Sequence, residues 1–244
     1  MKKLFRFTFL VIAIFLNSCS GEDDNQQESN NTEISDADGN VYYVQLIADQ
    51  HWTVDNLKTK TYRDGTPIPY VEDPLEWENL TTGAWRYVNN DPSTEEKYGL
   101  LYNFYAVNNP KGLSPIGSRI PSYQDYLHLT SYFGTPISSN PNDEIFSGFL
   151  TNDPDAPWSY GDISIIGTNS TGLNLYPAGF QRTTTSNNLF GMAAVLWSSD
   201  SNYNGAENSP FAVRFSRTST QNTVGSFASQ SFYGCSVRLI KENE

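Results

Sequence analysis

The stretch DADGNVYYVQLI, residues 36–47, decides how the ordered part of the chain begins. Its Asp-Gly-Asn triplet, which starts at Asp38, is typical of a tight turn, because glycine and asparagine accept backbone conformations that other residues avoid. The apolar side chains of Tyr42, Val44 and Leu46 then recur at every second position, which is the period of a β-strand with one buried face. We therefore expect the domain to start with a turn followed by a strand.

The stretch GCSVRLIK, residues 234–241, closes the chain with the same period. Alternate side chains fall on the two faces of the expected strand, with Cys235, Val237 and Leu239 on one and Ser236, Arg238 and Ile240 on the other. The first and last strands of a domain can pair, so we expect both ends of this domain to meet. Cys235 has no cysteine partner in the domain, and we expect it to be a small buried side chain in a domain that folds without a disulfide.

A first helix is expected in STEEKYGLLYNFYAV, residues 93–107. Ser93 or Thr94 can cap its start. Aromatic and apolar side chains recur at the spacing of one helix face, at Tyr98, Leu101, Tyr102 and Tyr105.

A second helix is expected in PSYQDYLHLTSYFGTP, residues 121–136. Ser122, followed three residues later by Asp125, predicts a capped start, and Gly134 with Pro136 predicts the end. The expected buried face consists of Tyr126, Leu129 and Phe133.

Residues 135–207 are rich in Asn, Ser, Gly, Asp and Pro, with only short apolar islands such as AVLWSS. Loops of this length inside a compact domain are unusual and are mostly functional or disordered. Strands at both ends, two helices and a long loop region are consistent with an α+β fold but do not identify it by themselves.

Residues 1–18 have the composition of an export signal. Lys2, Lys3 and Arg6 precede the apolar run of residues 9–16, which is shorter than the roughly 20 apolar residues of a membrane-spanning helix. The sequence Leu-Asn-Ser-Cys that ends at Cys19 resembles the lipobox of bacterial lipoproteins. We expect cleavage before Cys19 and acylation of that cysteine, with palmitate among the attached chains. The alternative is an ordinary secretory signal with a chance cysteine near its end.

Residues 19–35 are expected to form a flexible acidic and polar tether, because they offer almost no apolar surface to bury. The run SGEDD, residues 20–24, resembles the acidic tag of surface-exported lipoproteins of Bacteroidetes; the alternative is a solvated linker. We therefore expect an outer-membrane lipoprotein that is exposed at the cell surface and held to the membrane by its lipid.

The chain is strongly acidic, with 15 Lys and Arg against 27 Asp and Glu. Removing residues 1–18 takes away three of the basic residues, which leaves 12 against 27 and a formal charge of −15. Such a surface repels phosphate groups, so nucleic acid is not an expected partner.

Several blocks of sequence, in fixed order, resemble the Fibrobacter succinogenes major paralogous domain. These blocks are DGNVYYVQLIADQHWTVDNLKTKTYRDGTPIP, YGLLYNFYAV, GLSPIGSRIPSYQDYLHL, STGLNLYPAGF, LWSS and GCSVRLIK. The resemblance implies a single domain over residues 36–242. It also implies a C-type lectin-like fold, related to that of formylglycine-generating enzymes, with paired terminal strands, two helices, a small central antiparallel sheet and a long irregular loop region.

The chain departs from the family pattern at four places. A serine follows Gly117 where the family has a Gly-Trp pair, and an alanine follows Ile47 where it has Ile-Gly. Ser114 and Leu239 stand where the family often has cysteines, so the disulfide that the resemblance implies is absent here.

An enzymatic role is not expected. The chain has no Gly-x-Ser-x-Gly motif, and His51, His128 and Cys235 cannot supply the ligands of a zinc site. Copper-assisted cysteine oxidation is the chemistry of the formylglycine-generating relatives. It requires a pair of thiols, whereas Cys235 has no second cysteine in the expected domain. Paired carboxylates of the glycosidase type stay open, because acidic residues are plentiful and their separations cannot be read from a sequence.

Calcium is a candidate ligand of the loops SNPNDE, NDPDAPW and SSDSNYNGAEN, which carry carboxylate and amide oxygens. The resemblance to C-type lectins implies calcium in long loops, although neither signature triplet of that family is present. The turn at residues 36–40 is not a calcium loop of the EF-hand type, because its glycine is fourth instead of sixth.

The expected ligand-binding residues are Trp158, Tyr160, Tyr203, Asp153 and Asp155. An aromatic ring takes the apolar face of a sugar, while amides and carboxylates bind its hydroxyl groups. Two interpretations of Trp158 stay open: an exposed platform, or a plug that packs its loop onto the core. The other tryptophans are expected in the core: Trp52, Trp77, Trp85 and Trp197.

We therefore expect a non-catalytic extracellular binding module for glycans or polysaccharide. The alternative is a structural or adhesion protein whose loops bind other proteins.

Overall fold

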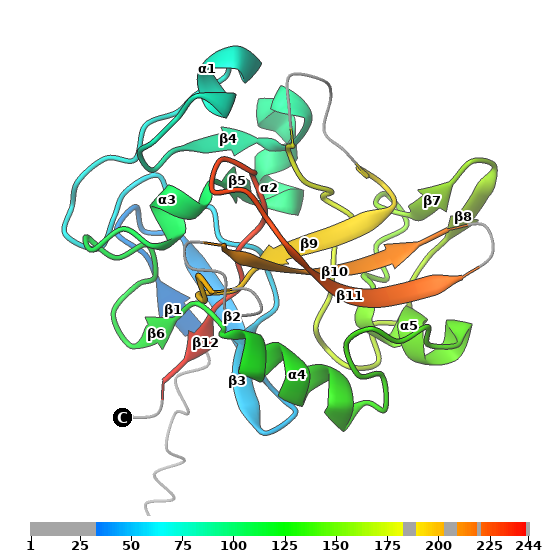
Figure 1. Ribbon diagram of the computed structural model, residues 1–244. Coiled ribbons are helices and arrows are strands. Elements are labelled where there is room, and N and C mark those ends of the chain that lie inside the picture. Colours follow the sequence, from blue (N-terminus) through cyan, green and yellow to red (C-terminus); the bar gives the residue numbers. More distant parts are fainter. Residues whose placement is uncertain (1–32, 183–188, 203–208, 219–220, 243–244) are drawn as a thin grey trace, which may run out of the picture. The chain divides into compact units, whose positions relative to one another are not determined.

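The computed structural model describes residues 33–182, 189–202, 209–218 and 221–242. Residues 31–244 group into one compact unit of mixed helices and small antiparallel sheets, which is an α+β fold (Figure 1). The expected signal peptide and residues 19–32 of the expected tether lie outside the described residues and stay predictions. The end of the tether is wrong, because Glu33–Ser35 form a strand that pairs with the strand after the turn, so the domain begins earlier than expected. Within the described part of the chain, no helix is long and apolar enough to cross a membrane.

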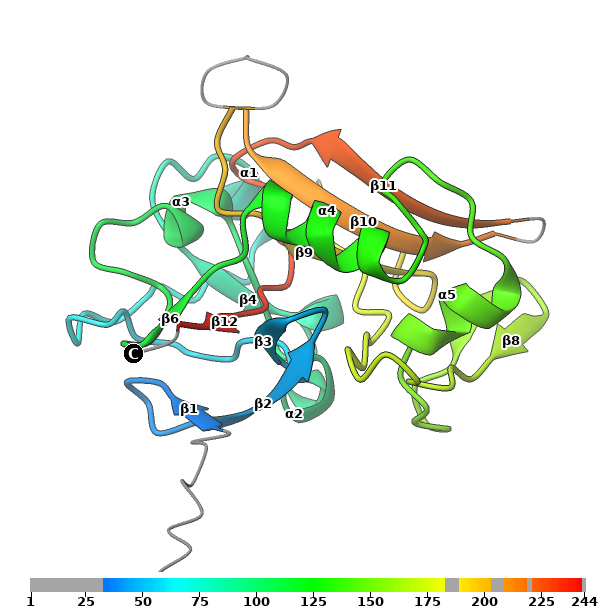
Figure 2. The same ribbon diagram turned by 90° about the horizontal axis from the view of Figure 1, so that it is seen from below.

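A five-stranded sheet brings the two ends of the described chain together (Figures 1 and 2). Its strands, in order across the sheet, are β1 (Glu33–Ser35), β2 (Val41–Ile47), β3 (Gln50–Thr53), β12 (Ile240–Lys241) and β6 (Ser118–Arg119). Every neighbouring pair is antiparallel. The opening and closing strands share this sheet, as expected, but they do not pair directly, because β3 lies between β2 and β12.

The turn before β2 is confirmed. Asp36 accepts hydrogen bonds at its carbonyl from the Gly39 amide (3.1 Å) and at its carboxylate from the Asn40 amide (2.9 Å), and Gly39 adopts a φ of 82°. The expected buried face of β2 is right for Tyr42 and Val44 but wrong for Leu46, which is 63% exposed. Tyr42 and Val44 pack into one core cluster, which does not include Leu46, whereas Ile47 on the opposite face of the strand packs into a second cluster with Trp52.

The remaining strands form smaller antiparallel sheets within the described residues. A three-stranded sheet has the order β11 (Asn222–Ala228), β10 (Phe211–Arg217) and β9 (Ala193–Trp197). Two-stranded sheets join β4 (Trp85–Tyr87) to β5 (Leu100–Tyr102), and β7 (Trp158–Tyr160) to β8 (Ile163–Ile165). All five residues of β9 are buried.

Helix α4 (Tyr123–Tyr132) confirms the second expected helix. Ser122 caps it and forms a reciprocal capping box with Asp125, and the chain leaves the helix at Gly134 with a φ of 70°. Its buried side chains include Tyr126 and Leu129, and the helix lies along β10 in Figure 2.

The expected helix over residues 93–107 is wrong. This stretch contains the 3-10 turn η2 (Pro92–Thr94), helix α2 (Glu95–Tyr98), strand β5 and helix α3 (Phe104–Val107). Gly99 ends α2 with a φ of 68°, and a Cβ there would lie 2.7 Å from the Asn56 Cβ. The next three residues pair with β4 instead of continuing the helix.

Residues 135–207 hold more regular structure than expected. Helix α5 (Asp143–Phe149) starts at Asn142, whose side chain accepts a hydrogen bond from the Ile145 amide (2.9 Å), and strands β7, β8 and β9 follow. The remaining helical segments are α1 (Pro74–Glu78) and the 3-10 turn η1 (Val88–Asn90).

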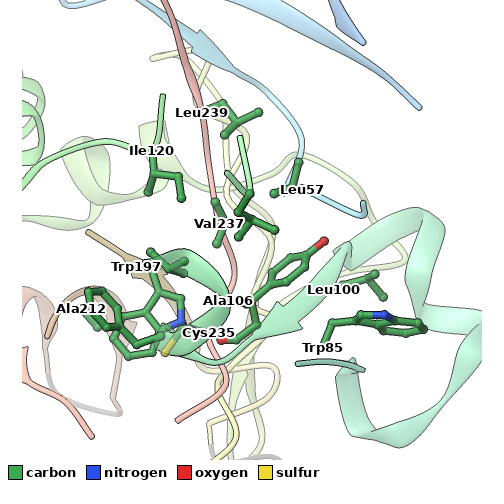
Figure 3. Packing of buried hydrophobic residues seen from close by; sticks show 14 of the residues in the cluster. Leu57, Trp85, Leu100, Ala106, Ile120, Trp197, Ala212, Cys235, Val237 and Leu239 are labelled. Atoms are coloured by element: carbon green, nitrogen blue, oxygen red, sulfur yellow. Dashed lines mark hydrogen bonds between the residues drawn. The ribbon is translucent and has the colours of Figure 1, made fainter. Parts of the chain in front are cut away.

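The core surrounds the last strand segment of the chain. Figure 3 shows Val237 and Leu239 between Ile120 and Leu57, with Cys235 next to Trp197. Cys235 is buried, as expected, and burial raises the pKa of its thiol. The four tryptophans expected in the core, at positions 52, 77, 85 and 197, are also buried.

Arg238 lies on the face of this segment opposite Cys235 and is fully buried. Its guanidinium donates to Asn56 Oδ1 (2.7 Å) and to the carbonyl oxygens of Thr53 (2.7 Å), Leu173 (2.9 Å) and Asn174 (2.9 Å). Burial lowers its pKa to about 10, so it remains charged at neutral pH. Both faces of the closing segment therefore belong to the interior.

Candidate functional site

Trp158 is a core residue, and its interpretation as an exposed platform is wrong. The side chain is 0% exposed, and its indole Nε1 donates to the Leu175 carbonyl (3.2 Å). Its ring meets the ring of Phe146 edge-on, with centroids 6.0 Å apart. Helix α5, which carries Phe146, supplies the apolar surface that covers this tryptophan.

Of the other expected site residues, those that the structure describes have separate surroundings. Tyr160 is 40% exposed at the end of the β7–β8 hairpin, and Tyr203 lies outside the described residues. Asp153 Oδ2 lies 2.9 Å from Lys97 Nζ, and the hydrogen bond from this lysine lowers the pKa of Asp153. Asp155 is exposed, and its amide donates to Asp153 Oδ1 (2.8 Å).

Calcium in the loops stays a prediction, and residues 203–208 of the third candidate loop lie outside the described residues. No group of three or more His, Cys, Asp or Glu side chains stands close enough for a metal in the part of the chain that the structure describes. Asp153 is paired with a lysine instead of facing Asp155 across a site.

A hollow of about 430 Å³ lies beside α3, and we call it the α3 hollow. Its lining residues are Thr81, Thr82, Gly83, Phe104, Tyr105, Asn108, Asn109, Pro110, Ser201 and Ser231. They come from the loop before β4, from α3 and its C-terminal loop, and from two further loops. Every one of these side chains is uncharged.

Buried Asn103 joins two walls of the α3 hollow. Its Oδ1 accepts from the amides of Ala106 and Ala84 (both 3.0 Å), and its Nδ2 donates to the Thr82 carbonyl (2.9 Å). The same side chain therefore caps α3 and holds the loop before β4 against it.

Gly83 allows these walls to approach closely. A Cβ at this position would lie 2.0 Å from the Tyr62 hydroxyl and 2.9 Å from the Ala106 Cα, which is closer than nonbonded atoms can stand. Glycine is required here because the backbone passes directly over α3.

A second hollow of about 390 Å³ lies at the first turn of α4, and we call it the α4 hollow. Its lining residues are Tyr123, Gln124, Ser199, Asp200, Ser201, Asn202 and Phe211. The rings of Tyr123 and Phe211 are stacked, with centroids 5.0 Å apart and an interplanar angle of 26°. Asp200 Oδ2 accepts from the Tyr123 amide (2.5 Å) and the Ser198 hydroxyl (2.7 Å), which fixes this carboxylate at the start of α4.

Ser201 borders both hollows, and we call the two together the α3–α4 groove. Among the described residues that line it, Asp200 is the one charged side chain. The sequence analysis missed this site. Tyr105 was assigned to a helix face, and Asn108 and Ser201 stand in polar segments that carry no distinctive motif.

Comparison with protein families gives one match. The model of the Fibrobacter succinogenes major domain matches residues 46–241, which is most of the chain. No curated protein matches, and no solved structure matches either. The chain belongs to the Fibrobacter succinogenes major domain family.

Proposed function

We propose that the protein is a non-catalytic glycan-binding module, anchored to the cell surface as a lipoprotein, and that the α3 hollow is its binding site. The observation that carries this proposal is the lining of the hollow, which combines aromatic rings with neutral amide and hydroxyl groups. Sugars offer apolar ring faces and many hydroxyl groups, so they match such a lining. The volume of the hollow falls in the range of small-molecule sites.

The lining of the groove favours binding over hydrolysis. Glycoside hydrolysis generally requires two carboxyl groups about 5 to 9.5 Å apart. Among the described residues, the α3 hollow is lined by no carboxylate and the α4 hollow by Asp200 alone. This carboxylate also holds the start of α4, which is a structural task.

The proposed location rests on the first 24 residues. The charged and apolar segments, the Leu-Asn-Ser-Cys sequence ending at Cys19 and the acidic run after it support lipid attachment and outward export. A C-type lectin-like fold is part of the same proposal. It is supported by the shared sheet of the opening and closing strands and by the small central sheet.

The function is tested by screening the full chain, purified in detergent, on an array of neutral and anionic oligosaccharides. We expect saturable binding to a set of neutral glycans, with affinity lowered about two- to tenfold by Tyr105→Ala, since stacking on one ring is worth roughly 0.5 to 1.5 kcal/mol. Tyr132→Ala is the matched control, because Tyr132 is 58% exposed on α4 and lines neither hollow. Equal loss in both variants, or binding to no glycan, would refute the proposal.

Lipid attachment is tested separately. Cys19→Ser should abolish metabolic labelling with palmitate, because serine cannot replace the cysteine at the acylated position. Replacing Glu22, Asp23 and Asp24 by alanine should reduce protease accessibility on intact cells without lowering the labelling. Normal labelling of the Cys19→Ser protein would remove the lipoprotein assignment.

Protein contact is the second candidate function, and the β7–β8 hairpin favours it. Tyr160, Ile163 and Ile166 are large apolar side chains that are exposed on or beside this hairpin. Exposed apolar side chains gathered on one surface element are typical of binding surfaces. Cell adhesion that is lost with Ile163→Ser and Ile166→Ser, but unaffected by Tyr105→Ala, would favour this candidate over glycan binding.

A further inference from the structure

We infer that the ligand of the α3–α4 groove is a neutral, linear oligosaccharide bound along its length, with successive sugars in the α3 hollow and the α4 hollow. This inference rests on the proposed glycan-binding function and adds the class of glycan and the direction in which it lies.

The two hollows are placed to receive one continuous chain. Ser201 lines both, so the two hollows are adjacent. The hollows are of similar size, about 430 and 390 Å³. A ligand that filled only one of them would leave a hollow of similar size empty beside it.

The α4 hollow repeats the chemistry of the α3 hollow with different residues. It offers the stacked pair of Tyr123 and Phe211 as an aromatic surface and the amides of Gln124 and Asn202 as hydrogen-bonding groups. The Asp200 carboxylate is held by two hydrogen bonds and can accept further ones from sugar hydroxyls. Because this end of α4 is fixed by its capping box, the second hollow is preorganised.

Charge selects against anionic glycans. No lysine or arginine is among the described residues that line either hollow, and the one charged group there is a carboxylate. Sulfate and uronate groups are generally bound by arginine and lysine side chains, which are missing from this lining. The ligand should therefore be neutral, and its affinity should hardly change with salt, since salt screens charge interactions and not stacking or neutral hydrogen bonds.

The test measures the affinity of the full chain, purified in detergent, for glucose-, mannose-, xylose- and galactose-based oligosaccharides of one to six units by calorimetry. For at least one series we expect affinity to rise about tenfold or more from the monosaccharide to the longer members and then to level off. Sulfated members of the same series should bind at least about tenfold more weakly.

Variants locate the chain in the groove. Tyr105→Ala should weaken binding of short and long members alike, whereas Gln124→Ala should weaken only the long ones, because only they reach the α4 hollow. Gln124 is exposed, so its replacement should leave the melting temperature unchanged. Tyr132→Ala serves again as the control that alters neither affinity nor chain-length dependence.

The outcomes separate this inference from the proposed function. Binding that is equally tight for monosaccharides and long chains, with Gln124→Ala without effect, would overturn the extended site and leave glycan binding in place. Preference for sulfated chains would overturn neutrality. Absence of binding to every series and every array glycan would overturn both the inference and the proposed function.

Discussion

Two aromatic side chains lie in environments that their local sequences do not suggest. Trp158 stands in the polar stretch NDPDAPWSYGD and is buried under α5, whereas Tyr105 stands in the largely apolar stretch LLYNFYAV, is partly exposed and lines the α3 hollow. The difference is made by residues far away in sequence. The Trp158 indole is bonded at Leu175, next to Leu173 and Asn174, whose carbonyl oxygens bind the guanidinium of Arg238.

In this chain, the polarity of the neighbouring sequence does not determine whether a side chain is exposed. A side chain in a polar segment becomes interior when other elements cover it, as α5 and the segment of residues 173–175 cover Trp158. The α3 hollow stays open because the hydrogen bonds of Asn103 hold its two walls in place. No other element in the described part of the chain covers these walls.

The largest expected effect on stability is at Arg238. Its guanidinium binds the carbonyl oxygens of Leu173 and Asn174, next to the residue that accepts the hydrogen bond of Trp158. Arg238→Ala should lower the free energy of unfolding by more than about 4 kcal/mol, because it leaves a cavity and several buried acceptors without a donor. Urea unfolding of the two proteins would measure this loss.

Arg86 provides the matched control for Arg238. It is also buried, but its Nε and Nη1 have no hydrogen-bond partner among the described residues, and desolvation by burial lowers the pKa of its guanidinium. The Nη2 of Arg86 donates to the Glu72 carbonyl (3.2 Å), and its guanidinium lies over the Trp77 ring with 5.4 Å to the centroid, so its charge is partly compensated. Arg86→Met should change stability by less than about 1 kcal/mol in either direction, since an apolar replacement removes a buried charge with few partners. Equal losses at the two arginines would show that the hydrogen bonds of Arg238 are not the cause.

The second prediction concerns Trp158 itself. Trp158→Ala should destabilise the domain by about 3 to 5 kcal/mol, as large-to-small substitutions in a core do. Thermal melts would detect the loss, and glycan binding by the folded fraction should be retained because the residue lines neither hollow. An unchanged melting temperature would indicate that Trp158 is exposed and would contradict its assignment to the core.

An element could be predicted from the sequence where the contacts that determine it lie between residues close together in the chain. Helix α4 was predicted because Ser122, Asp125 and Gly134 lie within the helix or at its ends. The helix over residues 93–107 was not, because its periodicity is overridden by the contact of Gly99 with Asn56 and by pairing with β4.

The groove was out of reach of sequence reasoning for the same reason. Its lining combines Thr82, Asn108 and Ser201, which are separated by long stretches of chain and carry no shared motif. Asn103, the residue that joins the walls, has no signature apart from its role as a helix cap, and the expected long helix hid that role.

The third prediction uses pH to separate the two regions. Burial would raise the pKa of Asp125, but hydrogen bonds from Arg119, Ser122 and Gln50 outweigh it and hold the pKa well below its usual value. A lowered folded-state pKa means that this stabilisation is fully present above the unfolded-state pKa of about 3.9 and is lost as pH falls below it. Acid should therefore loosen the start of α4, beside the α4 hollow, before it loosens β7.

Hydrogen exchange from pH 5 down to about pH 2 would follow the amides of both segments, because the stabilisation is lost between the unfolded-state pKa and the lower folded-state pKa of Asp125. Asp125→Asn should cost about 2 kcal/mol at pH 7, since charge-assisted hydrogen bonds are lost, and it should flatten the pH dependence of stability in this window. If the amides of α4 and β7 in the unsubstituted protein lost protection at the same pH, acid would be unfolding the domain as one unit. That result would contradict an earlier, local loosening at the start of α4.

The smallest expected effect on stability is at Tyr105, the groove side of the comparison. Tyr105 is partly exposed and lines the α3 hollow, so truncating it removes ring surface that is already in contact with solvent and leaves no closed cavity. Tyr105→Ala should therefore lower the free energy of unfolding by less than about 1 kcal/mol, against several for Trp158→Ala. Urea unfolding of the two variants under identical conditions gives the ratio directly. A loss at Tyr105 as large as that at Trp158 would show that its ring supports the packing of α3, and any weakening of glycan binding in that variant would then have to be assigned to a distorted hollow instead of a missing stacking surface.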